Sequence, residues 1–244
     1  METIYHSEVS SLNSRLQALK LQIEAVCLAA GRNPAEITLI GVSKTHPVDL
    51  VREAISVGLS VFGENKAQEI REKATAIPGK TNGGNIEWHF IGSLQRNKAK
   101  EVVRYADFFH ALDDLRLAET LNRLCSAQNR TLPCLVQVNI SQEDSKSGLS
   151  PKALPEFLSH CAAFDHLQIV GLMGIAHPTE DPESVRPEFR LLRTLRDEAI
   201  AQKVLPTNAK LSMGMSDDFA VAIQEGATHI RVGSALFGTR NYSP

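Results

Sequence analysis

The segment Ile37-Thr38-Leu39-Ile40-Gly41-Val42-Ser43-Lys44 is a short apolar run that ends in a lysine. Its β-branched and aliphatic residues predict a buried strand, and Lys44 follows at the carboxyl end of that strand. Two distant segments have a similar form, Leu211-Ser212-Met213-Gly214-Met215-Ser216 and His229-Ile230-Arg231-Val232-Gly233-Ser234. If the three strands lie parallel, their carboxyl ends bring together an amine, an arginine and small polar residues.

The same pattern recurs along the chain as eight short apolar runs separated by helical patterns. The expected strands are Thr38–Ser43, Ser60–Gly63, Glu87–Ile91, Phe108–Ala111, Leu135–Ile140, Gln168–Met173, Lys210–Met213 and Ile230–Gly233. The expected helices between them are Val48–Val57, Ala67–Ala76, Leu94–Val103, Leu115–Gln128, Ala153–Ala162, Ser184–Lys203 and Phe219–Glu225. This alternation of strands and helices predicts a parallel sheet.

A further helix is expected ahead of the first strand, at about residues 3–30. Apolar residues recur there at a spacing of three and four and form one stripe, which consists of Val9, Leu12, Leu16, Leu19, Ile23 and Val26. Gly31 and Pro34 end the helix.

We therefore expect an α/β fold, a single-domain (β/α)8 TIM barrel formed by residues 1–244 with an extra N-terminal helix. The length of 244 residues suits such a barrel, which typically has about 250 residues. An open, doubly wound sheet is the alternative that the pattern leaves. The segment Thr81–Asn85 is expected to be a flexible loop, since it contains Asn-Gly-Gly-Asn.

Composition narrows the functional classes. The net charge of −2 provides no basic field for nucleic acid or anionic lipid. No apolar run approaches the roughly 18 residues that a membrane helix needs, and the first residues lack the features of a signal peptide. We therefore expect a cytoplasmic protein that contacts neither membrane nor nucleic acid. The cysteines and histidines have no metal-ligand spacing, so no metal site is expected.

Lys44 is the first candidate for chemistry. In a barrel, functional groups lie at the carboxyl ends of the strands, where Lys44 is expected. A neutral lysine amine can attack an aldehyde and form a Schiff base. The alternative is a solvated lysine at the start of a loop, which the local sequence alone favours.

The loops after the last two strands form a candidate phosphate site. Ser216 could cap a helix that begins at Asp217, and Gly233 and Ser234 would let the backbone approach an anion. Asp217 and Asp218 would repel a phosphate unless they point away. The alternative is an ordinary helix cap with acidic residues in its first turn.

Arg231 lies at an inward-facing position of the last strand if Val232 packs outward. A guanidinium beside a pyridine nitrogen would donate a hydrogen bond and keep that nitrogen unprotonated, which limits carbanion chemistry. A structural salt bridge is the alternative for Arg231.

The sequence resembles the family of pyridoxal phosphate homeostasis proteins over nearly its whole length. The matching segments are Val42-Ser43-Lys44-Thr45, Phe62-Gly63-Glu64-Asn65, Trp88 to Gln95, Asn139-Ile140, Ser145 to Leu149, Gly171-Leu172-Met173 and Leu211 to Asp218. The resemblance implies a barrel similar to the N-terminal domain of alanine racemase. It also implies that pyridoxal 5'-phosphate is bound covalently to Lys44 as a Schiff base.

By the same resemblance, Ser216, Gly233 and Ser234 would hold the phosphate, Arg231 would meet the ring nitrogen, and Asn65 would lie near the ring. The family implies a carrier that buffers or delivers the cofactor and so maintains vitamin B6 and the balance of amino and keto acids. No catalytic residue is assigned. The expected partners are pyridoxal phosphate and apo forms of enzymes that use it, and a monomer is expected.

Three further lysine and histidine positions bear on the resemblance. Lys66 stands where an aromatic residue is frequent in the family, and His46 stands where lysine is frequent, which puts any relay between neighbouring lysines in doubt. Lys146 matches a loop lysine of the family, for which the resemblance suggests a part in cofactor transfer or secondary binding.

Two other functions remain open at the level of sequence. An amino-acid racemase would need an acid or base on each face of the substrate carbon, and none of the tyrosines follows a site strand. A phosphosugar-binding barrel would share the anion site, and only a coloured aldehyde cofactor would distinguish the two.

Overall fold

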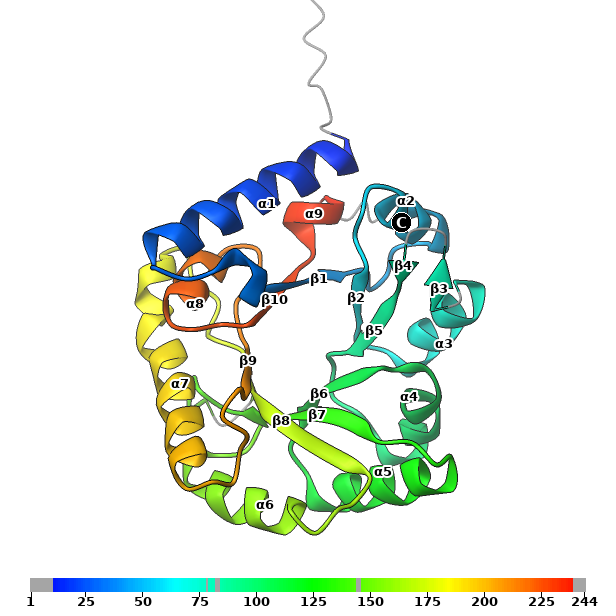
Figure 1. Cartoon of the computed structure of the whole chain (residues 1–244), viewed down its shortest axis with the longest axis vertical. Helices are drawn as coiled ribbons and strands as arrows, with labels where there is room; N and C mark the ends of the chain where they lie inside the picture. Colours follow the sequence, from blue (N-terminus) through cyan, green and yellow to red (C-terminus); the bar gives the residue numbers. More distant parts are fainter. Residues whose placement is uncertain (1–10, 78, 82–83, 144–145, 239–244) are drawn as a thin grey trace, which may run out of the picture.

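Eight parallel strands close into a barrel in the computed structural model, which describes residues 11–77, 79–81, 84–143 and 146–238 (Figure 1). The strands are β1 (Thr38–Val42), β2 (Val61–Glu64), β5 (Glu87–Phe90), β6 (Phe108–Leu112), β7 (Leu132–Val138), β8 (Leu167–Gly174), β9 (Lys210–Ser212) and β10 (His229–Val232). Their order around the barrel is β1-β10-β9-β8-β7-β6-β5-β2. Because β1 pairs with β10, the expected barrel is confirmed and the open sheet is excluded.

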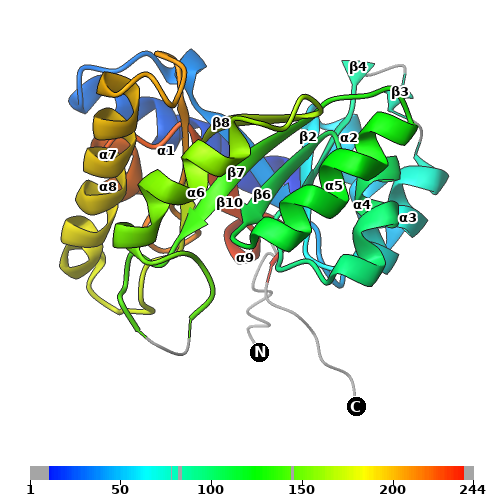
Figure 2. The same cartoon turned by 90° about the horizontal axis from the view of Figure 1, so that it is seen from below.

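Helices form an outer ring around the barrel (Figures 1 and 2). They are α1 (Leu12–Ala29), α2 (Val48–Ser56), α3 (Ala67–Ala76), α4 (Ala99–Tyr105), α5 (Leu115–Ala127), α6 (Leu154–Cys161), α7 (Arg186–Ala201), α8 (Phe219–Gln224) and α9 (Ser234–Phe237). Short 3-10 turns at Pro34–Glu36, Arg96–Lys98, Pro151–Ala153 and Pro182–Val185 are η1 to η4. No helix in the described ranges is long and apolar enough to cross a membrane.

The two ends of the barrel carry different segments. In Figure 2 the loop after β7 lies at the lower edge, and the small hairpin of β3 (Lys80–Thr81) and β4 (Gly84–Asn85) lies at the upper edge. The lower edge therefore holds the carboxyl ends of the barrel strands.

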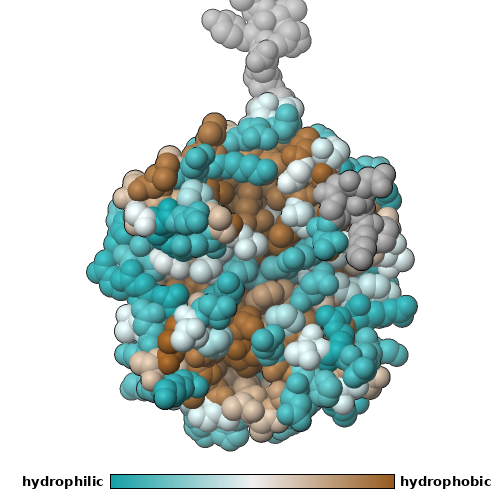
Figure 3. All heavy atoms as spheres, in the orientation of Figure 1, coloured by the Kyte–Doolittle hydropathy of each residue, from teal (hydrophilic) through white to brown (hydrophobic). Residues whose placement is uncertain are grey.

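The expected N-terminal helix is present as α1, which packs outside the barrel beside α8 and α9 (Figure 1). Its buried residues are Leu12, Leu16, Leu19, Ile23 and Cys27, so the predicted apolar stripe faces the protein. Val9 and the rest of the predicted turns before residue 11 lie outside the described residues. Figure 3 shows hydrophobic residues at the upper left, where α1 lies, and Leu21 and Leu28 on this helix are exposed.

Some predicted boundaries were wrong. The strand expected at Leu135–Ile140 begins earlier, because β7 includes Pro133. It also ends earlier, because the backbone N–H of Asn139 donates to the Leu149 carbonyl. The helix expected at Leu94–Val103 is a 3-10 turn followed by α4. The loop expected at Thr81–Asn85 includes parts of the β3–β4 hairpin, although residues 82 and 83 lie outside the described residues.

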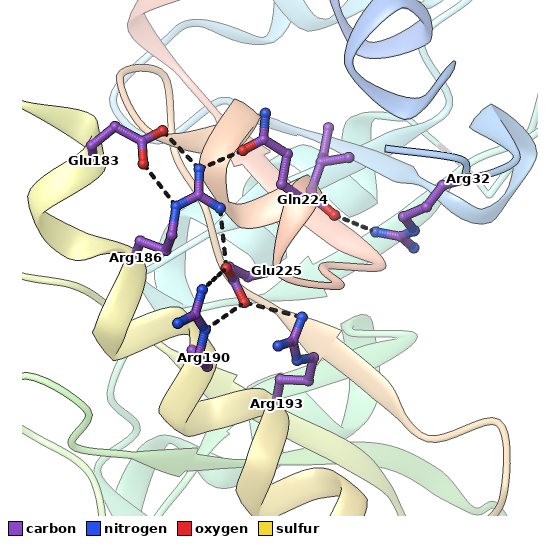
Figure 4. Close-up of polar contacts among 8 residues, drawn as sticks. Arg32, Glu183, Arg186, Arg190, Arg193, Gln224 and Glu225 are labelled. Carbon is purple, nitrogen blue, oxygen red and sulfur yellow. Dashed lines mark hydrogen bonds and ion pairs between the residues drawn. The ribbon is translucent and has the colours of Figure 1, made fainter. Parts of the chain in front are cut away.

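A buried carboxylate joins α7 to the end of α8 (Figure 4). Glu225 accepts contacts from Arg186, Arg190 and Arg193, each at 3.0 Å, and its side chain is only 4% exposed. Burial acts to raise the pKa of Glu225, but the surrounding arginines outweigh burial and lower it. Glu225 therefore anchors the helix pair as a carboxylate.

We expect Glu225→Gln to lower the free energy of unfolding by about 1–3 kcal/mol, because three guanidinium groups lose their charged acceptor. The pKa of Glu225 lies below its unfolded value, so its contribution is present above the usual glutamate pKa of about 4.3 and is lost as pH falls through the folded value. Urea unfolding at several pH values measures this. Glu183→Gln is the control: this exposed residue bonds Arg186 alone, and equal losses in both variants would contradict the anchoring role.

Candidate functional site

A pocket of about 600 Å³ opens at the carboxyl ends of the strands. Side chains that follow β1, β2, β5, β7, β8, β9 and β10 contribute to its lining. All six residues predicted from the sequence line this one pocket: Lys44, Asn65, Ser216, Arg231, Gly233 and Ser234. The barrel therefore brings together groups from four separate parts of the sequence.

Lys44 lies just beyond β1, and among the described residues its amine has no hydrogen-bond or ion-pair partner. It is half-buried in the pocket rather than fully solvated. The next residue, Thr45, has a φ of 68°, a left-handed conformation that is rare for a β-branched residue. The Thr45 N–H donates to Glu69 Oε2 at 2.6 Å, which holds the strained turn that aims Lys44.

Glu69 is suited to hold this turn as a carboxylate. Burial acts to raise its pKa, but the hydrogen bond from the Thr45 backbone and the charge of Lys73 outweigh that effect and lower it. The turn at Lys44 is therefore tied to an ionised side chain of α3.

A buried ion pair supports the backbone where the neighbouring strands β1 and β2 end at the pocket. Glu64 Oε1 accepts from Ser43 Oγ at 2.6 Å and from Lys73 Nζ at 2.7 Å, and Lys73 also donates to the Ser43 carbonyl at 2.7 Å. Burial raises the pKa of Glu64, and Lys73 opposes that rise. Because Ser43 precedes Lys44 and Glu64 precedes Asn65, this network fixes two of the pocket residues at once.

Asn65 presents an unusual polar atom. Its side-chain Oδ1 is buried and has no hydrogen-bond partner among the described residues. Gly92 lies so close that a Cβ there would come within 2.6 Å of the Asn65 carbonyl oxygen. The absence of a side chain at Gly92 thus lets the loops after β2 and β5 meet beside Asn65.

Arg231 is buried at the base of the pocket. One terminal nitrogen donates to Ser212 Oγ at 2.7 Å and the other donates to the Gly174 carbonyl at 3.0 Å. The partners in these two bonds are a hydroxyl and a carbonyl, so they do not form the structural salt bridge that was the alternative for Arg231. Burial lowers the pKa of Arg231 to about 10, with Asp218 acting in the opposite direction, so the guanidinium stays charged at neutral pH.

Ser216 and Ser234 adjoin each other at the rim. Ser234 Oγ donates to Ser216 Oγ at 3.0 Å, and the Ala235 N–H donates to Ser216 Oγ at 3.4 Å. The prediction that Ser216 caps the following helix was wrong, since α8 begins at Phe219 and Ser216 instead bonds the first turn of α9.

The two aspartates after Ser216 differ in their placement. Asp218 is buried, and its carboxylate accepts from the Met215 N–H at 2.6 Å, whereas Asp217 lines the pocket. Burial raises the pKa of Asp218. The Asp218 carboxylate is thus bonded within its own turn, so of these two aspartates only Asp217 lines the pocket where it would repel an anion near Ser216.

Comparisons with known proteins agree with this geometry. Residues 15–241 match the family described as "Alanine racemase, N-terminal domain". The "Pyridoxal phosphate homeostasis protein" of Aquifex aeolicus is 40% identical over 228 residues, which is 93% of this chain and 98% of that protein. The chain belongs to the pyridoxal phosphate homeostasis protein family.

Solved structures extend the comparison for this family member. PipY of Synechococcus elongatus PCC7942, solved with PLP bound, is 34% identical with a TM-score of 0.79, covering 93% of this chain and 100% of that chain. An alanine racemase of Clostridium difficile 630 is 13% identical with a TM-score of 0.71, covering 96% of this chain and 57% of that chain. The second likeness shows the fold alone.

His46, Lys66 and Lys146 differ in how they lie relative to the pocket. His46 lines it, and its ring lies 5.2 Å from the ring of Phe237. Lys66 is exposed and pairs with Glu69 at 3.6 Å, away from the lining. Lys146 lines the pocket and pairs with Glu143 at 2.6 Å. Within the described part of the chain, no three His, Cys, Asp or Glu side chains group as a metal site.

Sequence reasoning missed the polar residues inside the barrel. His89, His110 and Ser212 are buried and bonded to one another and to Arg231. The available signal was a histidine or serine within each of three expected strands, at positions that alternate with apolar residues.

We expect Lys73→Met to lower the free energy of unfolding by about 3–5 kcal/mol, because it leaves the Glu64 carboxylate buried without a cation, with Ser43 Oγ still donating to it. Adding Glu64→Gln should restore part of that stability, since the amide removes the charge while keeping a similar shape. Urea unfolding of the single and double variants measures the difference. A double variant no more stable than Lys73→Met would contradict the coupling of the two side chains.

Proposed function

We propose that this protein binds pyridoxal 5'-phosphate covalently through Lys44 and acts as a carrier that buffers or delivers the cofactor. The observation that carries the proposal is the Lys44 amine, which has no partner among the described residues and shares a pocket with Arg231 and two serines. When bound, the cofactor supplies an aldehyde carbon that accepts an amine reversibly. Such a carrier would maintain vitamin B6 and the balance of amino and keto acids.

The donor set fits the groups of this cofactor. Arg231 is a fixed cation for a ring nitrogen, and the hydroxyls of Ser216 and Ser234 with the Gly233 backbone suit a phosphate. The buried amide oxygen of Asn65 has no partner among the described residues, so it could accept a hydrogen bond from a polar substituent on the ring. The PLP that is bound in the PipY structure and the names of the curated relatives support the same assignment.

We favour a carrier over an enzyme because of Arg231. A guanidinium donates a hydrogen bond to a pyridine nitrogen without transferring its proton, so the ring becomes a weaker electron sink. A two-base racemase also needs groups placed on both faces of the substrate carbon. Tyr105, the tyrosine within the described residues, ends α4 and does not line the pocket. We therefore assign no catalytic residue.

The partners remain part of the proposal. Apo forms of enzymes that use pyridoxal phosphate are the proposed recipients, and the carrier is proposed to act as a monomer in the cytoplasm. Transfer would place the cofactor of Lys44 on the lysine of a recipient. A phosphosugar barrel would use the same rim serines but would not engage Lys44 in a coloured adduct.

We expect the purified protein incubated with pyridoxal phosphate to show a yellow absorption band, and borohydride to fix a pyridoxyl group on the Lys44 peptide. Lys44→Ala should lose the band and the modified peptide while it keeps its circular dichroism, because this side chain is not part of the core. Peptide mass mapping measures the site of attachment.

Lys66→Ala is the matched control, because Lys66 is a nearby lysine that lies outside the pocket lining. It should keep both the band and the modified peptide. A wild-type protein that stays colourless with pyridoxal phosphate, or a pyridoxyl group found on another lysine, would contradict the proposal.

A further inference from the structure

A continuous chain of hydrogen bonds runs through the interior of the barrel to the pocket. His89 Nδ1 lies 2.9 Å from His110 Nε2, and His110 Nδ1 lies 2.9 Å from Ser212 Oγ. Ser212 Oγ in turn accepts from Arg231 at 2.7 Å. At the other end, His89 Nε2 lies 3.5 Å from Glu87 Oε2. The chain thus joins β5, β6, β9 and β10 across the barrel.

The direction of this chain follows from the hydrogens available. Arg231 has only donors, so the Ser212 oxygen accepts, and the single Ser212 hydrogen is free to donate to His110 Nδ1. His110 then carries its hydrogen on Nε2 and donates to His89 Nδ1, which leaves the hydrogen of His89 on Nε2, facing Glu87. In the opposite direction, the Ser212 hydrogen would have no acceptor among the described residues.

The surroundings keep the His110 imidazole neutral. Burial lowers the pKa of His110, and nearby positive charge lowers it further. The titratable and charged groups around the chain are Glu87 and His89 on β5, Lys210 on β9, His229 and Arg231 on β10, and Asp218, which acts on Arg231. The rings of Phe108 and His229 close the remaining space around His110 at 4.8 Å and 5.9 Å between ring centres.

The far end of the chain reaches solvent. Glu87 is the first residue of β5, at the end of the barrel opposite the pocket, and its side chain is 58% exposed. The nearby His89 ring lowers the pKa of Glu87, so its carboxylate is charged at neutral pH. A negative charge at this end favours the hydrogen on His89 Nε2, which agrees with the direction that the Arg231 donors impose.

We propose that Ser212, His110 and His89 are positioning residues that hold Arg231 for the ring nitrogen of a bound cofactor, with the charge of Glu87 favouring the same direction of the chain. This inference rests on the proposed function. Bonds in such a chain polarise one another, so Ser212 is a stronger acceptor for Arg231 than an isolated hydroxyl. The terminal nitrogens of Arg231 are then held by Ser212 and Gly174, which orients the face that the guanidinium presents to the pocket.

The test compares Ser212→Ala with Ser212→Thr in the full-length protein. Pyridoxal phosphate affinity is measured by absorbance titration, and an isotopically labelled ring nitrogen is followed by NMR. Ser212→Ala should weaken affinity about tenfold, the effect of losing one hydrogen bond to a charged group. It should also move the nitrogen signal toward that of the free unprotonated cofactor. Ser212→Thr, which keeps the hydroxyl, should restore both values.

Two further variants separate this chain from general damage to the core. His229→Gln changes a buried histidine of the same aromatic cluster that bonds Thr228 instead of the chain, and it should leave the nitrogen signal in place. The exposed Glu87→Gln should move that signal in the same direction as Ser212→Ala, by a smaller amount. If Ser212→Ala does not fold, Glu87→Gln and Ser212→Thr decide the question.

The outcomes distinguish the two proposals. A wild-type protein that binds no pyridoxal phosphate contradicts the proposed function itself. A wild-type protein that binds it, together with variants Ser212→Ala and Glu87→Gln whose nitrogen signals match the wild type, overturns only the positioning role. A signal that moves equally in His229→Gln would also overturn it.

Discussion

The pairing of β1 with β10 is the constraint on which the site depends. Thr38 pairs with His229 and Gly41 pairs with Val232, so the first and last strands of the barrel run side by side. Lys44 follows β1 and Gly233 follows β10, and this register therefore sets the amine beside the rim serines. In an open sheet these two strands would not have to meet. Closure also removes both sheet edges, so the same backbone bonds stabilise the fold and assemble the pocket.

The barrel uses two kinds of interior for two purposes. Apolar side chains fill the layer between the strands and the helices, and Phe62, Phe90 and Phe109 are among the largest of them. In the space that the barrel strands enclose, by contrast, two histidines, a serine and an arginine form hydrogen bonds with one another. A buried polar chain of this kind is costly unless its members are paired. Its placement directly behind Arg231 gives a reason for keeping it in place of an apolar core.

The sequence allowed the fold and the pocket lining to be predicted to different depths. Strand alternation with helices predicts the barrel, and the rule that function lies at strand ends then selects Lys44 and the rim residues, whereas Asn65 was implied by the family resemblance. Side-chain partners are a different matter, because they depend on rotamers and register across the barrel. Ser216 bonds α9 rather than capping α8, since the turn from Met215 to Asp218 delays the helix by two residues. The sequence analysis considered the histidines only as metal ligands, although His89 and His110 each lie within an expected strand and between apolar residues.

Rigidity around Lys44 is consistent with holding a cofactor rather than transforming one. The residue lies between a buried ion pair that fixes Ser43 and a left-handed Thr45 that is held by Glu69. Such strain persists only where surrounding contacts determine it, and both contacts come from α3 and its preceding strand. The amine itself stays without a partner among the described residues, so its backbone is held while its nitrogen is left available. A lysine whose backbone is held in place and whose amine is left available is suited to reversible attachment of an aldehyde. In the proposed carrier, the guanidinium of Arg231 on the neighbouring strand would disfavour the carbanions that catalysis requires.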